Sequence, residues 1–272
     1  MYLVTRSLTG TQAARPAAAV ELMHNFTLVH DDVMDGDRLR RGRATVWAVW
    51  GVNDAILLGD VLHSLAFRMV SADMPSGLAA AVSTRLAAAG IEVCRGQQED
   101  CVFETRAGVS MDEYIAMAAG KTGALMGCAA ALGALCAGAP EDTVEAVENF
   151  GKELGLAFQF GDDIMGLWGD PATTGKPAGQ DLVRRKRTLP VIAALESDTA
   201  AARSLTELYL SPQPMTPCEI AAATELVVAA GGKHKATEYV EKCVTAALMA
   251  LPTDLRTPDL KALAHLVAGR DR

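Results

Sequence analysis

The chain has 272 residues, of which 50% are hydrophobic and 21% charged, and its formal net charge is −8 at pH 7. A chain of this length can bury a large core. Its acidic balance argues against a nucleic-acid-binding protein, because phosphate contacts require a surplus of Lys and Arg on some face, and we expect no nucleic-acid partner.

Alanine, leucine and methionine dominate, whereas the alternating β-branched and aromatic runs typical of strands are nearly absent. We therefore predict an all-α protein. No repeat or change of composition marks a boundary, so we expect one helical domain over residues 1–272. In chain order the periodicity predicts helices over residues 15–35, 53–70, 77–100, 111–136, 141–168, 188–195, 200–210, 217–230, 234–251 and 258–267.

Membrane insertion is not expected from the hydropathy of the sequence. No uninterrupted apolar run approaches the roughly 18 to 20 residues that a membrane-spanning helix requires. The N-terminus carries no basic segment followed by an apolar one, as a secretory signal would. We expect a cytoplasmic protein without stable membrane insertion.

Four acidic residues lie within the segment 31–37, at the end of the first predicted helix. At 100° per residue, His24, Thr27, Asp31 and Asp35 fall on one helix face. Acids near a helix C-terminus are destabilised by the macrodipole unless a cation compensates. Carboxylates in this arrangement suit Mg²⁺, which binds one or two of them together with water and phosphate oxygens. The alternative interpretation is a solvated helix end.

A second acidic stripe lies late in the helix predicted over residues 141–168, where Gln159, Asp162, Asp163 and Gly166 run beside an apolar stripe. The densest basic clusters of this acidic protein follow the two stripes. They comprise Arg38, Arg40, Arg41 and Arg43 after the first, and Lys176, Arg184, Arg185, Lys186 and Arg187 after the second. Metal ions, Arg forks and Lys charges together suit a diphosphate, unless these cations merely neutralise nearby aspartates.

These segments resemble the trans-isoprenyl diphosphate synthases, also called polyprenyl synthetases, over most of the chain. Asp31–Asp35 resembles the first aspartate-rich motif, and residues 40–45 the Arg-Arg-Gly-x-Pro-Thr that follows it, with Ala44 where proline is usual. The other matching pieces are residues 96–100, Lys121 with Thr122, Gln159 with Asp162 and Asp163, Lys176, and residues 186–190. Gly166 replaces the last aspartate of the second motif.

The resemblance implies an isoprenoid-synthase-type helical bundle, usually homodimeric, whose central cavity holds an allylic diphosphate under three Mg²⁺ ions. The implied metal ligands are Asp31, Asp35 and Asp162. The implied allylic-diphosphate ligands are Arg40, Lys121, Lys176 and Lys186, and Thr122 and Gln159 would line the path of the allylic carbon. His24 and Arg41 match residues that bind isopentenyl diphosphate in the family.

The implied reaction needs no nucleophilic side chain. Divalent ions and basic side chains stabilise the departing diphosphate, and the π bond of isopentenyl diphosphate then attacks the allylic cation, which lengthens the chain by five carbons. Residues one turn before the first motif help to set product length in the family. Phe26, followed by the small Thr27, favours a C20 product, geranylgeranyl diphosphate.

One family segment has no counterpart in this sequence. A Gly-Gly-Lys-x-x-Arg-Pro segment that binds isopentenyl diphosphate is absent from the residues before Asp31. One explanation is that N-terminal helices are missing from the sequence. A second is a class I terpene cyclase that acts on an allylic diphosphate alone, which would also explain Gly166. A third is a weakly catalytic subunit of a heteromeric synthase.

Overall fold

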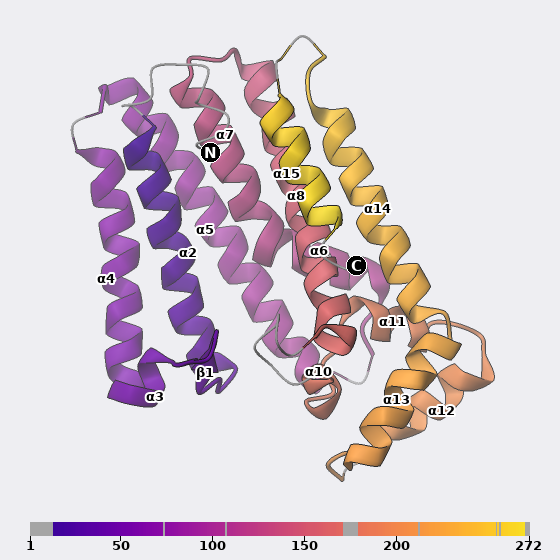
Figure 1. Ribbon diagram of the computed structural model, residues 1–272. Helices are drawn as coiled ribbons and strands as arrows, with labels where there is room; N and C mark the ends of the chain where they lie inside the picture. Colours follow the sequence, from indigo (N-terminus) through magenta and orange to yellow (C-terminus); the bar gives the residue numbers. More distant parts are fainter. Residues whose placement is uncertain are drawn as a thin grey trace.

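The computed structural model describes residues 13–72, 74–106, 108–170, 179–211, 213–253, 255 and 257–269. It consists of packed helices and one two-stranded hairpin (Figure 1). The elements are α2 (Ala14–Met34), β1 (Leu39–Arg40), β2 (Arg43–Ala44), α3 (Val46–Trp50), α4 (Val52–Ser71), α5 (Ser76–Thr105), α6 (Met111–Ala118), η1 (Ala119–Gly123), α7 (Ala124–Cys136), α8 (Glu141–Trp168), α10 (Gln180–Val183), α11 (Leu189–Leu195), α12 (Ala200–Leu210), α13 (Pro217–Ala229), α14 (Gly232–Ala250) and α15 (Pro258–Ala268).

The all-α prediction is confirmed, and every predicted helix is present. The segment predicted as one helix over 111–136 is interrupted by η1, a π-helical turn at Ala119–Gly123. Helix α5 continues to Thr105, beyond its predicted end. The hairpin and the short helices α3 and α10 were not predicted, because elements this short carry no periodic signal.

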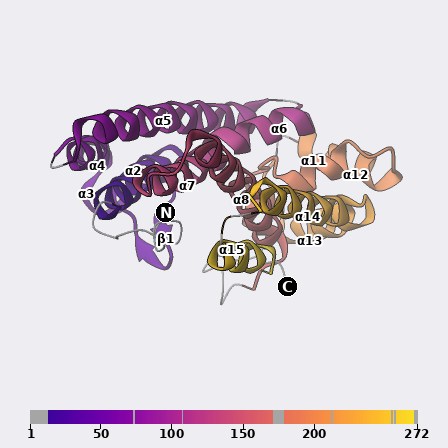
Figure 2. The same ribbon diagram turned by 90° about the horizontal axis from the view of Figure 1, so that it is seen from above.

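Helix α8 lies in the middle of the molecule, with α2, α4 and α5 on one side and α14 on the other (Figures 1 and 2). Its apolar face forms the largest core cluster, in which Phe150, Leu154 and Phe160 are fully buried. A second cluster joins α2, α4, α5 and α7 around Met23 and Leu86. Burying one such side chain contributes about 1.5–3 kcal/mol, so these clusters fix the helices that carry the polar stripes.

The contact between α5 and η1 depends on small residues. A Cβ added to Gly96 of α5 would lie 2.2 Å from the backbone nitrogen of Lys121, so no larger residue fits there. This close approach brings Asp100, one turn after Gly96, beside Lys121 in the π-helical turn. Such turns are frequent at functional sites because they re-aim a side chain out of the regular helix.

Two helical segments are long and apolar enough to cross a membrane, namely Ser76–Thr105 and Met111–Cys136. No such segment was expected from the sequence, because no apolar run is uninterrupted over this length. A mean hydropathy taken over 18 residues tolerates isolated charged residues. Half of the most apolar window of Met111–Cys136 is buried inside the molecule. Length and composition alone do not distinguish such a segment from the core helix of a soluble protein.

Candidate active site

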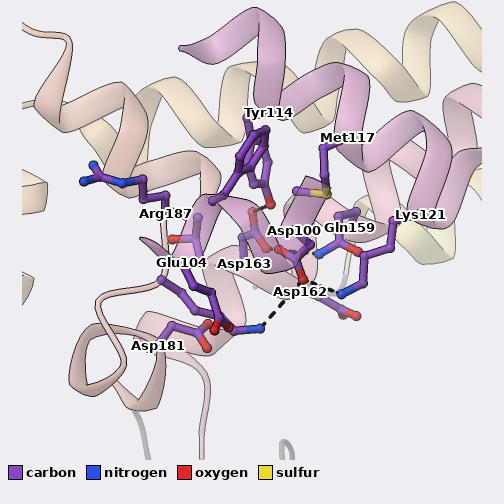
Figure 3. A pocket seen from close by; sticks show the side chains of 13 residues that line it. Asp100, Glu104, Tyr114, Met117, Lys121, Gln159, Asp162, Asp163, Asp181 and Arg187 are labelled. Carbon is purple, nitrogen blue, oxygen red and sulfur yellow. Dashed lines mark hydrogen bonds and ion pairs between the residues drawn. The ribbon is translucent and has the colours of Figure 1, made fainter. Parts of the chain in front are cut away.

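A polar cavity of about 160 Å³ lies where α5, α6, η1, α8 and α10 meet (Figure 3). Asp162 of the second acidic stripe lines it from α8, and Lys121 lines it from η1. Asp181 and Lys186 reach it from the segment around α10. Acidic and basic side chains that are far apart in the sequence therefore share one cavity.

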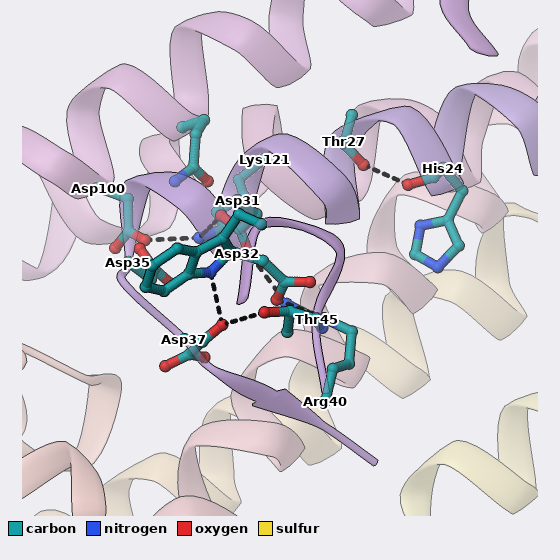
Figure 4. A network of polar contacts seen from close by, with 12 residues as sticks. His24, Thr27, Asp31, Asp32, Asp35, Asp37, Arg40, Thr45, Asp100 and Lys121 are labelled. Carbon is teal, nitrogen blue, oxygen red and sulfur yellow. Dashed lines mark hydrogen bonds and ion pairs between the residues drawn. The ribbon is translucent and has the colours of Figure 1, made fainter. Parts of the chain in front are cut away.

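Two lysines connect this cavity with the first acidic stripe. The Nζ of Lys121 lies 2.6 Å from Asp100 Oδ2 and 3.5 Å from Asp31 Oδ1 (Figure 4). The Nζ of Lys186 lies 3.6 Å from Asp35 Oδ2 and 4.0 Å from Asp100 Oδ2. The first motif, the Asp100 segment and the basic cluster after the second motif thus meet at one place.

Opposite charges in this cluster stabilise the ionised forms of Asp100, Lys121 and Lys186. Burial alone would raise the pKa of Asp100, but Lys121 and Lys186 outweigh it, and the pKa is lowered. Burial opposes the charge of each lysine as well, and the neighbouring aspartates still raise both lysine pKa values. Asp31 differs, because burial raises its pKa despite the nearby Lys121. Both lysines are therefore charged at neutral pH and are paired with the surrounding aspartates.

The carboxylates at this site suit Mg²⁺ ions that are also bound by phosphate oxygens of a ligand. The Oδ1 atom of Asp31 is buried and accepts no hydrogen bond, and the nearest cation is the Lys121 ammonium at 3.5 Å. Within the described ranges no three carboxylate, imidazole or thiol groups are close enough to hold an ion by themselves. Mg²⁺ characteristically takes one or two carboxylates and fills its remaining positions with water and phosphate oxygens. Asp31, Asp35 and Asp162 fit that mode of binding.

The loop after the first motif holds its arginine in place. The Nε of Arg40 donates a 2.7 Å hydrogen bond to the buried Asp32, and its Nη2 lies 3.6 Å from Asp31 Oδ2. A second ion pair joins the Arg184 guanidinium to the carboxylate of Asp37, which is 147 residues away in the sequence. These pairs fix the hairpin loop against the segment that carries Lys186.

A buried hydrogen-bond network supports the second motif. The Oγ1 of Thr122 donates to Gln159 Oε1 over 2.7 Å, and Gln159 Nε2 donates to Asp163 Oδ1 over 3.2 Å. Asp163 also accepts hydrogen bonds from the Tyr114 hydroxyl and from the backbone nitrogen of Leu189. Burial outweighs these donors and raises the pKa of Asp163 to about 7. The network anchors the start of α11, three residues after Lys186.

Comparison with known proteins identifies the family. A family model described as polyprenyl synthetase matches residues 1–227, most of the chain. The chain belongs to the polyprenyl synthetase family. This confirms the resemblance, the expected bundle fold and the expected enzyme class, a trans-prenyltransferase.

The relatives are isoprenyl diphosphate synthases. The chain is 53% identical over 94% of its length to a geranylgeranyl diphosphate synthase of Mycobacterium tuberculosis and covers 73% of that protein. A polyprenyl synthetase structure from Streptomyces coelicolor has a TM-score of 0.90 at 39% identity, covering 98% of this chain and 82% of that one. A geranylgeranyl pyrophosphate synthase from Corynebacterium glutamicum, solved with isoprenyl diphosphate and magnesium, has a TM-score of 0.87 at 26% identity, covering 99% and 84%.

The two residues that resemble the isopentenyl diphosphate site, His24 and Arg41, interact electrostatically. His24 is half-buried, and burial, together with the charges of Arg41 and Arg40, lowers its pKa although Glu21 acts in the opposite direction. Arg41 is exposed in the hairpin turn. Its φ of 50° lies in the left-handed region, which residues other than glycine seldom adopt. The backbone carbonyl of His24 accepts a 2.7 Å hydrogen bond from Thr27.

Phe26, predicted to influence product length, belongs to an aromatic cluster between α2 and α4. Its ring centroid lies 4.9 Å from that of His30 and 5.2 Å from that of His63, both edge-on. His63 in turn contacts Phe67, with ring centroids 5.1 Å apart. Offset aromatic contacts of this kind make a stiff wall.

Some site residues were not predicted, and one prediction is not described by the structure. Lys176 lies outside the described residues. Asp181 was not singled out, because it follows a segment rich in Gly and Pro and belongs to a helix too short to show periodicity. Tyr114 gave no signal beyond that of a core aromatic residue, and its partner Asp163 was recognised only as part of a motif.

Proposed function

We propose that this enzyme condenses an allylic diphosphate with isopentenyl diphosphate, and that its product is geranylgeranyl diphosphate. The observation that carries the proposal is the position of Lys121 and Lys186, which lie against aspartates of the first motif and line the cavity that contains Asp162. This combination of charges suits a diphosphate held together with divalent ions. The M. tuberculosis relative named for the same product supports the choice of product.

The roles of the side chains follow from their chemistry. Arg40, Lys121 and Lys186 hold the allylic diphosphate and stabilise the negative charge that grows on it as its bond to carbon breaks. Asp31, Asp35 and Asp162 hold Mg²⁺, which supplies Lewis-acid stabilisation when bound. We extend the diphosphate-binding role to Lys176, and the isopentenyl-diphosphate role to His24 and Arg41.

The cavity also has to protect the allylic cation. Thr122 and Gln159 are hydrogen-bonded to each other, so Gln159 presents its amide with a fixed orientation beside the cavity. The cluster around Phe26 closes the space between α2 and α4, where the growing hydrocarbon chain ends. Excluding water in this way prevents capture of the cation by hydrolysis.

Product analysis tests the reaction. The purified protein is incubated with Mg²⁺ and farnesyl diphosphate, with and without isopentenyl diphosphate. We expect a C20 prenyl diphosphate only when both substrates are present. Hydrocarbon or alcohol formed from farnesyl diphosphate alone would support a terpene cyclase, and inactivity that a second subunit relieves would support a heteromeric synthase. The relatives named as synthases favour the first outcome.

We further propose that the enzyme is a homodimer. The outer face of α3 and α4 exposes large apolar side chains, at the edge of the molecule in Figure 1. Trp50 is 65% exposed, Leu57 61% and Val61 53%. Large apolar side chains exposed on one face mark an interaction site. We assign this face to a second copy of the chain, because most soluble oligomers are symmetric assemblies of identical subunits.

A further inference from the structure

An ion pair at the edge of the charged cluster joins two segments that are far apart in the sequence. The guanidinium of Arg184, just after α10, donates a hydrogen bond to the carboxylate of Asp37, in the loop between α2 and the hairpin. The side chain of Arg184 is 37% exposed, whereas that of Lys186 is 20% exposed. The pair therefore lies nearer to solvent than the contact between Lys186 and Asp35.

The Asp37 end of the pair is held by the backbone of its loop (Figure 4). The carbonyl oxygen of Asp37 accepts 2.8 Å hydrogen bonds from Thr45 Oγ1 and from Trp47 Nε1. The backbone nitrogen of Asp37 donates a 2.9 Å bond to the carbonyl oxygen of Asp32. Because these three bonds fix the main chain at this residue, its carboxylate is a firm anchor for Arg184.

The Arg184 end is shaped by an unusual backbone conformation at the next residue. Arg185 has a φ of 51°, in the left-handed region, which a residue with a side chain keeps only when its surroundings require it. Its backbone nitrogen donates a 2.9 Å bond to the carbonyl oxygen of Leu182, and its guanidinium is bonded to the carbonyl oxygen of Gln213. With Arg185 held in this way, Arg184 and Lys186 on either side of it both reach acids at and after the end of α2.

We propose that Arg184 is a positioning residue whose ion pair with Asp37 retains the prenyl diphosphate intermediate between successive condensations. The inference rests on the proposed function. A diphosphate held by Lys186, and through Mg²⁺ by Asp35, lies between the two segments that the ion pair ties together. Its release requires these segments to separate, and opening steps of this kind set the release rates of many enzymes.

The consequence concerns product length. A C15 intermediate has to stay in the site until another isopentenyl diphosphate enters and reacts. The ion pair slows its escape, so the chain grows to the length that the cavity allows. Product length then depends on retention at the diphosphate end as well as on the aromatic wall around Phe26.

The first test measures the escape of the intermediate. Radiolabelled geranyl diphosphate, bound with Mg²⁺ to an excess of the full chain, is mixed with isopentenyl diphosphate and a large pool of unlabelled farnesyl diphosphate. Intermediate that escapes is diluted into the pool and stays C15, whereas retained intermediate becomes labelled C20. We expect Arg184→Gln to raise the ratio of labelled C15 to labelled C20 by about two- to fivefold, the range for one partly exposed ion pair, without any product longer than C20.

The second test separates escape from slow condensation. The unreactive thiolo analogue of farnesyl diphosphate is bound with Mg²⁺, and its rate of dissociation is measured after an excess of unlabelled analogue is added. Arg184→Gln should release it about two- to fivefold faster, and Arg184→Lys, which keeps the charge, should stay close to the unmodified chain. Arg85→Gln is the matched control, because it removes ion pairs to Glu141 and Glu148 that do not line the cavity, and it should leave release unchanged even if it lowers the melting temperature.

Asp37→Asn examines the pair from its other side. It should speed release of the analogue as Arg184→Gln does, and the double variant should be no faster than either single variant, because both remove the same interaction. Unchanged release from Arg184→Gln, or from Asp37→Asn if Arg184→Gln does not fold, overturns the proposal, as does a double variant in which the two effects multiply. If the unmodified chain makes the C20 product while Arg184→Gln releases the analogue at the same rate, only this inference fails. If the unmodified chain neither makes product nor binds the analogue with Mg²⁺, the proposed function fails with it.

Discussion

The hydroxyl of Tyr114 donates a hydrogen bond to the carboxylate of Asp163, and both side chains are buried at the wall of the cavity. The bond joins α6 to α8. Because Asp163 also accepts from the Leu189 nitrogen, the same carboxylate holds the start of α11. The second aspartate of the motif therefore fixes the segment that carries Lys186 and Thr188, while its neighbour Asp162 lines the cavity.

The first prediction concerns stability against pH in metal-free buffer. The pKa of Asp163 is raised from 3.8 to about 7, so between these values the folded protein keeps a proton that the unfolded chain releases. Stability contributed at this site is present below pH 3.8, falls as pH rises by about 1.4 kcal/mol per unit, and levels off above pH 7. In denaturant titrations, the unfolding free energy of the unmodified chain minus that of Asp163→Asn should fall across this window.

Tyr114→Phe gives the matching control for that series. It removes a hydrogen bond that lowers the pKa of Asp163, so the window of declining stability should extend above pH 7. Comparing variants cancels the contributions of other carboxylates. A difference between the unmodified chain and Asp163→Asn that stays constant from pH 5 to pH 7 would contradict the assignment of this pKa.

Much of the fold could be predicted from the sequence because long helices repeat their apolar pattern over many turns. Helix α8 begins and ends where its apolar pattern does, at Glu141 and Trp168. The π-helical turn at Lys121 could not be predicted, since it arises from the close approach of Gly96 on another helix. Tertiary contact, rather than local propensity, decides such a feature.

The site was predictable where motif residues lie on one helix, as Asp31 and Asp35 do. It was not predictable where the partner comes from elsewhere in the chain. The pair formed by Arg184 and Asp37 has no local signature, and the contact between Asp181 and Gly166 appears only when α10 is docked on α8. The sequence shows only that glycine stands at position 166 where the family motif has an aspartate. It does not show that the Asp181 side chain lies against this glycine in the folded protein.

The second prediction separates catalysis from folding at Asp31. Its Oδ1 atom is buried without a hydrogen bond, and burial raises its pKa, so the acid contributes little to stability. Asp31→Asn should lower kcat by a factor of about a hundred or more, as expected when one charge-stabilising group is removed from a preorganised site. The melting temperature should not fall. Asp112→Asn, an exposed acid on α6, is the control and should change neither quantity. A large loss of melting temperature in Asp31→Asn would indicate a structural aspartate.

The third prediction tests the dimer. Leu57 is 61% exposed on the proposed interface, and Leu210 is 66% exposed on α12, away from it. Light scattering should give the unmodified chain twice its monomer mass. Leu57→Glu should shift the mass towards the monomer, because a charge in an apolar interface is poorly solvated, whereas Leu210→Glu should leave it unchanged. A monomeric unmodified chain, or equal masses for both variants, would refute the interface.

The fourth prediction concerns product length. Phe26 stands edge-on to His30 and His63 and closes the space between α2 and α4, so Phe26→Ala should open this wall and yield prenyl diphosphates longer than C20. Products labelled through isopentenyl diphosphate are dephosphorylated and separated by reverse-phase chromatography. Phe67→Leu is the control, because Phe67 contacts His63 within the same cluster, and it should alter stability more than product length. An unchanged C20 product from Phe26→Ala would show that another part of the cavity limits chain growth.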